Sequence, residues 1–138
     1  MKKILILAIL FSLAGSFSSC KEKETDITKV NEITGKWELL KITISFTPEG
    51  AISRDYSQNN IVYEFKADGI LTVSRDINHS DTYVHEQGDH FYSIIDDKEE
   101  YTLKIDNNLY WYSVSNNDLI IDQSPLDGFT YYFVKLKN

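Results

Sequence analysis

From residue 33 onward, apolar and polar positions alternate along the chain in short runs that are typical of β-strands. In one such run, Ile61, Tyr63 and Phe65 share one face, whereas Glu64 and Lys66 lie on the other. Turn residues separate the runs, and no segment carries an apolar stripe at helical spacing over three turns. The pattern predicts about nine short strands, at residues 37–46, 61–66, 70–74, 82–85, 90–95, 101–105, 109–115, 119–122 and 129–136.

The connections between these strands are mostly short turns, which favours an antiparallel barrel or sandwich. Asp68-Gly69 is a strong hairpin signal. Residues 47–60 are polar and are predicted to form a long loop, and residues 25–33 are the one stretch where a short helical turn fits. An open sheet would leave edge strands that pair with other chains, whereas closure into a barrel of about eight strands removes those edges.

The first 19 residues have the pattern of a secretory signal, with Lys2 and Lys3 before the apolar run 4–11 and small residues up to Cys20. The apolar run is shorter than the roughly 20 residues that span a bilayer. The segment Phe17-Ser18-Ser19-Cys20 resembles the lipobox of bacterial lipoproteins. The resemblance implies cleavage before Cys20, addition of acyl chains such as palmitate, and anchoring in the cell envelope, at the outer membrane. The alternative is an incidental thiol after an ordinary signal.

We therefore divide the chain into a signal peptide at residues 1–19, a polar flexible tether at residues 20–32, and a barrel domain at residues 33–138. Acidic residues in the tether partly resemble the surface-export signal of Bacteroidetes lipoproteins. Loss of the two signal-peptide lysines takes the formal net charge from −7 to −9. This acidity argues against nucleic-acid partners and against charge-driven binding to anionic lipid, so the predicted membrane contact depends on lipidated Cys20.

Gly35-x-Trp37 at the start of the first predicted strand resembles the G-x-W signature of the lipocalins. Three further segments are similar to small lipocalin-like lipoproteins of bacteria, at residues 63–73, 111–121 and 131–136. The resemblance covers residues 33–138 and implies an all-β, antiparallel, up-and-down barrel of about eight strands, with Trp37 packed across its closed end. A T-D-x-x-Y type segment and an Arg that covers the Trp, both usual in that family, are not evident here.

Aromatic residues make up 13 % of the chain, and the resemblance implies a small hydrophobic or amphipathic ligand inside the barrel. A tyrosine combines an apolar ring with a polar tip, which suits an amphipathic molecule. The candidate ligand-binding residues of the interior are Trp37, Tyr63, Phe65, Tyr92, Tyr112 and Tyr131. The alternative is that these rings fill the core, because barrels of this size are usually filled by side chains.

The histidines His79, His85 and His90 lie close together in the sequence, beside Glu86 and Asp89. Their spacing misses the H-E-x-x-H zinc motif by one residue, and Gly88 places a turn between them, so we interpret them as solvated loop residues. The chain also has no G-x-S-x-G elbow, phosphate loop or dinucleotide fingerprint. We predict a non-catalytic protein without a metal or cofactor.

Three hypotheses of function remain open. The leading one is a lipid-anchored barrel that binds a small hydrophobic or amphipathic ligand. The second is a filled barrel that binds another envelope protein through its loops or through outward tyrosine and tryptophan side chains. The third is a hydrolase that uses a histidine of residues 79–90.

Overall fold

The computed structural model describes residues 30, 32–45, 47–48, 50–76, 81–96, 101–123 and 128–137. The signal peptide, most of the tether and Cys20 lie outside these residues, as does His79. The described residues form nine β-strands: β1 (Gly35–Ile44), β2 (Ile52–Asp55), β3 (Val62–Phe65), β4 (Ile70–Ser74), β5 (Gly88–Asp96), β6 (Tyr101–Ile105), β7 (Asn108–Ser115), β8 (Asp118–Asp122) and β9 (Phe129–Lys135). Within the described residues, no helix is long and apolar enough to cross a membrane.

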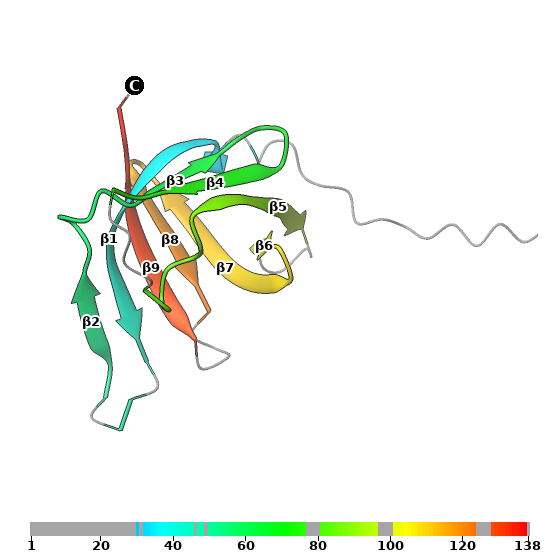
Figure 1. The fold of residues 1–138 in the computed structure, drawn as a ribbon. Coiled ribbons are helices and arrows are strands. Elements are labelled where there is room, and N and C mark those ends of the chain that lie inside the picture. The colour runs from blue at the N-terminus through cyan, green and yellow to red at the C-terminus, as the bar shows by residue number, and fades with distance from the viewer. Residues whose placement is uncertain are drawn as a thin grey trace, which may run out of the picture.

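The strands form one antiparallel sheet that closes on itself (Figure 1). From β3 to β9 each strand pairs with the next one in the chain, and β9 pairs with β1, which in turn pairs with β3. This order is an eight-stranded up-and-down barrel, and β2 is an additional strand beside the second half of β1. The predicted all-β barrel of about eight strands is therefore confirmed.

A β-bulge at Leu40 changes which residues of β1 face the core. Leu39 lies opposite Phe133 and Lys41 lies opposite Tyr132, so Leu40 is an extra residue without a partner position on β9. Before the bulge the odd-numbered residues are buried, and after it Ile42 is buried instead. One inserted residue moves the following side chains to the opposite face, and this keeps both halves of β1 apolar toward the core.

Two predicted elements differ from the structure. The predicted loop at residues 47–60 contains β2, whose four residues are all exposed and pair with residues 41–44 of β1. The predicted strand at residues 82–85 is wrong, because this segment forms a turn closed by the bond from the Val84 amide to the Asp81 carbonyl. Side-chain contacts inside the barrel end outweigh the β propensity of Tyr83 and Val84 there.

The barrel interior is packed with side chains from every barrel strand. All six candidate interior residues point inward and are at most 9 % exposed, namely Trp37, Tyr63, Phe65, Tyr92, Tyr112 and Tyr131. Edge-to-face ring contacts join Phe65 to Tyr92, with centroids 5.0 Å apart, and Tyr63 to Phe133, with centroids 4.8 Å apart. Such pairs are a favoured geometry for buried aromatic rings.

Trp37 closes one end of the barrel. Its side chain is fully buried, and its indole N–H donates a hydrogen bond of 2.7 Å to the carbonyl of Ile33, in the helical turn that precedes β1. The ammonium group of Lys135 lies 5.0 Å from the centre of the Trp37 ring. A cation over this tryptophan was not evident from the sequence, because it is a lysine on the last strand and not an arginine.

Candidate functional site

The end of the barrel opposite Trp37 is filled by residues 81–87, which we call the plug segment. Val84 of this segment is buried in the core. The Asp81 carboxylate accepts a hydrogen bond of 2.5 Å from the Tyr56 hydroxyl, and the Arg54 guanidinium lies 4.3 Å from the centre of the Tyr83 ring. The segment just before β5 lies near β9 in Figure 1, and the ring contacts of Tyr83 with Phe129 and of His85 with Tyr131 place it beside that strand.

His85 of the plug segment lies among three tyrosines, which we call the tyrosine cage: Tyr63 on β3, Tyr110 on β7 and Tyr131 on β9. The ring centroid of His85 is 5.7 Å from the centroid of each of them. Its Nδ1 is 2.9 Å from the Tyr63 hydroxyl, and its Nε2 is 3.0 Å from the Tyr110 hydroxyl. The prediction that His85 is a solvated loop residue is therefore wrong.

The hydrogen bonds of the cage assign the tautomer of His85. The Tyr63 hydroxyl oxygen accepts a bond of 3.2 Å from the backbone N–H of His85, so its own proton is available for Nδ1. Nδ1 then acts as the acceptor, and Nε2 carries the proton that it donates to the Tyr110 oxygen. The Tyr110 hydroxyl can then donate its own proton in a further hydrogen bond.

Burial sets the protonation of the cage. It lowers the pKa of His85 to about 4, with a smaller contribution from the positive charge of His90, so His85 is neutral at pH 7. Burial raises the pKa of Tyr110 to about 12 and holds the pKa of Tyr63 well above its usual value. The cage therefore presents neutral hydroxyls and a neutral imidazole.

His90 beside the cage is in the opposite protonation state. Its Nδ1 is 2.7 Å from the Asp106 carboxylate, and its Nε2 is 2.8 Å from the backbone carbonyl of Glu86. Both partners are acceptors, so both ring nitrogens carry protons. Burial opposes the charge, but the bonds to Glu86 and Asp106 outweigh it and raise the pKa of His90. His90 is thus a charged residue at the rim, with its ring centroid 5.9 Å from that of His85.

A pocket of about 220 Å³, which we call the rim pocket, opens beside His85. Its walls are residues 82–85 of the plug segment together with Asn108, Tyr110, Gln123, Phe129 and Tyr131. Because His85 is neutral, every lining side chain is uncharged. Aromatic rings form apolar walls, while the amide and hydroxyl groups provide hydrogen-bond donors and acceptors.

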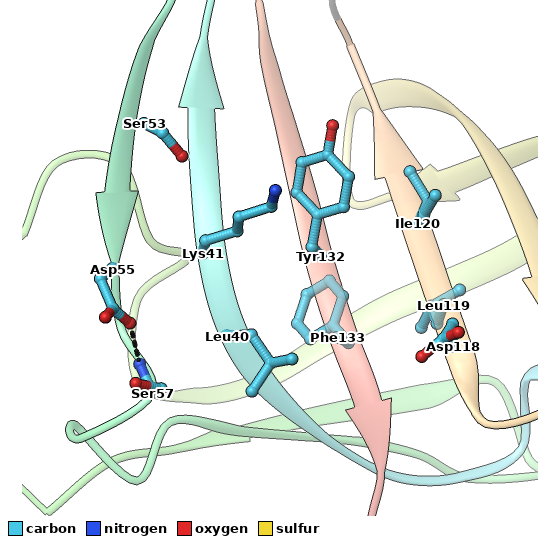
Figure 2. Close-up of a pocket in the computed structure, with 10 residues that line it drawn as sticks. All are labelled: Leu40, Lys41, Ser53, Asp55, Ser57, Asp118, Leu119, Ile120, Tyr132 and Phe133. Carbon is cyan, nitrogen blue, oxygen red and sulfur yellow. Dashed lines mark hydrogen bonds between the residues drawn. The ribbon is translucent and has the colours of Figure 1, made fainter.

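A second hollow of about 650 Å³ lies on the outer surface of β2, β1, β9 and β8, and we call it the outer groove. Figure 2 shows Lys41 reaching toward Tyr132 across the middle of this groove, with Asp55 and Asp118 on its two sides. The Lys41 ammonium is 4.2 Å from the centre of the Tyr132 ring. Because of the bulge, the side chains of two consecutive residues, Leu40 and Lys41, line the outer groove.

The structure brings two of the six candidate interior residues, Tyr63 and Tyr131, into the tyrosine cage. Phe65, Tyr92 and Trp37 lie toward the opposite end, where the Tyr92 hydroxyl donates to the Lys66 carbonyl, and Tyr112 sits between the ends. Sequence reasoning missed Tyr110, which shares the inward face of β7 with the candidate residue Tyr112. The described residues hold no group of three or more His, Cys, Asp or Glu side chains that could bind a metal.

No protein-family model, curated protein or solved structure matches the chain.

Proposed function

We propose that this protein is a lipid-anchored, lipocalin-like barrel of the bacterial cell envelope that binds a small uncharged amphipathic molecule in the rim pocket. The observation that carries the proposal is the lining of that pocket, which combines aromatic walls with uncharged polar groups. The accessible lining of the pocket is mainly polar, and such polar groups can fix the orientation of a ligand that packs its apolar part against the rings.

The size of the rim pocket limits the ligand. Pockets that bind drug-sized ligands have volumes of about 300–1,000 Å³, whereas the rim pocket has about 220 Å³. A molecule of one or two rings is therefore the size class that we propose. A charged ligand is disfavoured, because the pocket provides no side chain of opposite charge to offset the cost of desolvation.

We propose binding without catalysis. A general base needs a free nitrogen or oxygen within hydrogen-bond reach of the substrate. Both ring nitrogens of His85 are already bonded to tyrosine hydroxyls, and those of His90 are bonded to Asp106 and Glu86. This arrangement supports a binding site over the alternative of a histidine hydrolase.

Native mass spectrometry of the full chain, purified from its own host, tests the binding proposal. We expect a bound small molecule in the wild-type chain and at least a tenfold loss of it in Phe129→Ala, which removes an aromatic wall of the rim pocket. The matched control is Phe91→Ala, because Phe91 is 76 % exposed on the outer face of β5. A wild-type chain that carries nothing, or equal loss in both variants, would contradict the proposal.

The membrane anchor has its own test. Since the chain beyond the signal is acidic, we propose that acyl chains on Cys20 are its attachment and that charge contributes little. Cys20→Ala should move the protein from the membrane fraction to the soluble fraction, whereas a high-salt wash should not release the wild-type protein. Membrane retention of Cys20→Ala would rule out the lipid anchor.

The outer groove favours a second candidate function, the binding of another envelope protein. Trp111 on the neighbouring strand β7 is 44 % exposed, and Ile120 and Tyr132 extend the apolar surface toward Leu40. Exposed aromatic and aliphatic side chains on adjacent strands are common in protein interfaces. Loss of a co-purifying protein in Trp111→Ser, with the small-molecule complex unchanged, would favour this function over the first.

A further inference from the structure

His85 occupies the tyrosine cage in the way that a bound ligand would. Its imidazole is attached to the plug segment, but its ring contacts come from three strands that are distant in the sequence. One ring nitrogen accepts a hydrogen bond from the Tyr63 hydroxyl, and the other ring nitrogen donates one to the Tyr110 hydroxyl. The plane of the Tyr131 ring is inclined by 37° to the imidazole and covers one of its sides.

We propose that the tyrosine cage is a binding site for a planar, uncharged nitrogen heterocycle, and that the plug segment holds His85 there as an occupant which such a ligand displaces. The inference rests on the proposed function, since it names the ligand class and the regulation of the same end of the barrel. The ligand has an acceptor nitrogen and a donor nitrogen on opposite edges of its ring, as imidazoles and benzimidazoles do.

Hydrogen-bond complementarity selects this class. The Tyr63 hydroxyl offers its proton to one edge of the imidazole, so a ligand that replaces the ring in the same way has an acceptor at that edge. Tyr110 accepts at the other edge, so the cage requires a donor there. A hydrocarbon ring would leave both buried hydroxyls without the ring-nitrogen partners that His85 provides, at a cost of about 1–3 kcal/mol each.

The surroundings also require a neutral ring. His90 carries a positive charge, and its ring centroid is 5.9 Å from that of His85. The Asp106 carboxylate that offsets this charge is bonded to Nδ1 of His90, at 2.7 Å, and to the Phe91 amide, at 3.0 Å. At the position of His85, the repulsion from His90 exceeds the attraction from Asp106, so a cationic ligand in the cage is disfavoured.

The plug segment is attached in a way that allows displacement. Its residues lie between β4 and β5 and belong to neither strand, so no ladder of backbone hydrogen bonds holds them. The plug is held by the burial of Val84, by the bonds of the His85 backbone N–H to Tyr63 and of the His90 ring to the Glu86 carbonyl, and by side-chain contacts. The side-chain contacts are those of Asp81 with Tyr56, of Tyr83 with Arg54 and Phe129, and of His85 with the cage. Segments with few backbone bonds open at lower free-energy cost than strands do. The rim pocket borders this segment and gives a ligand room to enter.

The first test removes the occupant. In His85→Ala, 4-methylimidazole at about pH 8.5, where an imidazole is mainly neutral, should bind saturably and raise the melting temperature. Toluene, with a similar ring size and no nitrogen, is the control probe and should bind at least tenfold more weakly. Adding Tyr110→Phe to His85→Ala should weaken 4-methylimidazole binding about tenfold. Equal binding of both probes, or none to the folded variant, would overturn the proposal.

The second test uses the wild-type chain and so remains decisive if His85→Ala does not fold. A tethered occupant competes at an effective concentration in the millimolar range or above, so benzimidazole is added up to its solubility limit. Hydrogen exchange of residues 81–87 should then become faster, while exchange in β5 stays unchanged. Unchanged exchange throughout would show that His85 is a fixed structural residue. That result would leave the Phe129→Ala test of the rim pocket intact, so the two proposals fail separately.

Discussion

Trp37 and Trp111 place the same side chain in opposite surroundings, which makes them a matched pair. Trp37 is fully buried and donates to the Ile33 carbonyl, whereas Trp111 is 44 % exposed on the outer face of β7. We expect Trp37→Phe to lower the free energy of unfolding by about 2–4 kcal/mol, from a lost buried hydrogen bond and a partial cavity. We expect Trp111→Phe to change it by about 0.5 kcal/mol or less. Urea denaturation measures both, and equal effects would contradict the role of Trp37.

The buried His85 makes the free energy of unfolding depend on pH in the acid range. Burial lowers its pKa from 6.5 to about 4 in the folded chain, so between these values the unfolded chain binds more protons. The free energy of unfolding should therefore fall as the pH falls from about 6.5 through 4, by about 3 kcal/mol in total. His85→Gln should show a smaller loss over the same range, measured by urea denaturation at each pH.

Two groups near His85, His90 and Asp106, also change the free energy of unfolding with pH, and their contributions have to be separated from that of His85. The raised pKa of His90 stabilises the fold at pH values below its ordinary range, and this contribution is lost as the pH rises through the raised value. The bond from His90 lowers the pKa of Asp106, whose contribution is lost as the pH falls below the ordinary range of an aspartate. Because both remain in His85→Gln, the difference between the two curves gives the contribution of His85 together with its electrostatic coupling to these two groups. Superimposable curves would show that burial does not perturb this histidine.

At the scale of elements, the bulge at Leu40 keeps the apolar side chains of both halves of β1 directed toward the core. Deleting Leu40 would shift residues 41–44 by one position against β9 and turn Ile42 and Ile44 away from the core. Loss of two buried isoleucines costs about 4–10 kcal/mol, which is comparable to the whole stability of a domain. We expect the Leu40 deletion to unfold the protein by circular dichroism.

The control for this deletion lies in the connection between β1 and β2. Ala51 is exposed and precedes β2, so its deletion shortens a surface loop and leaves the pairing of β1 with β9 unchanged. The Ala51 deletion should therefore keep a cooperative unfolding transition. If both deletions give folded protein, the register of β1 is not fixed by the bulge.

Alternation in the sequence was sufficient to predict the strands that have one buried face. Ile61, Tyr63 and Phe65 lie inward as expected, and Asp68-Gly69 forms the β3–β4 turn with Gly69 at φ 84°. The bulge was not predictable, because Leu39 and Leu40 are both apolar and either one fits the core face. Strand β2 was also missed, since its four residues are exposed and show no alternation.

The site was less predictable than the fold for a physical reason. The inward position of Tyr63 and Tyr131 follows from local alternation, but the burial of His85 depends on three strands that meet only in the closed barrel. The plug segment has strand-like composition, and its shape is set by side-chain contacts with Arg54, Tyr56 and the cage. Such long-range contacts leave no periodic signal in the sequence.

At the scale of the whole molecule, pairing of β1 with β9 closes the barrel, so every barrel strand has a hydrogen-bonded neighbour on both sides. The additional strand β2 keeps one free edge. Without β9, β1 and β8 would both expose unpaired backbone groups, and such edges promote aggregation. The core would also lose Tyr131 and Phe133, which are 4 % and 2 % exposed. Losing each aromatic side chain costs about 3–5 kcal/mol, so the sum approaches the 5–15 kcal/mol that stabilises a typical domain.

A chain that ends at Gln123 should therefore fail to form the barrel. We expect it to elute as aggregates in size-exclusion chromatography and to show no cooperative transition in urea. The control ends at Leu136, because the amide of Leu136 still donates to the Lys36 carbonyl at 2.9 Å and every residue of β9 is retained. This control should unfold like the full chain. A monomeric, cooperatively folding chain without β9 would mean that the first eight strands are stable as an open sheet, and closure would then not be the source of stability.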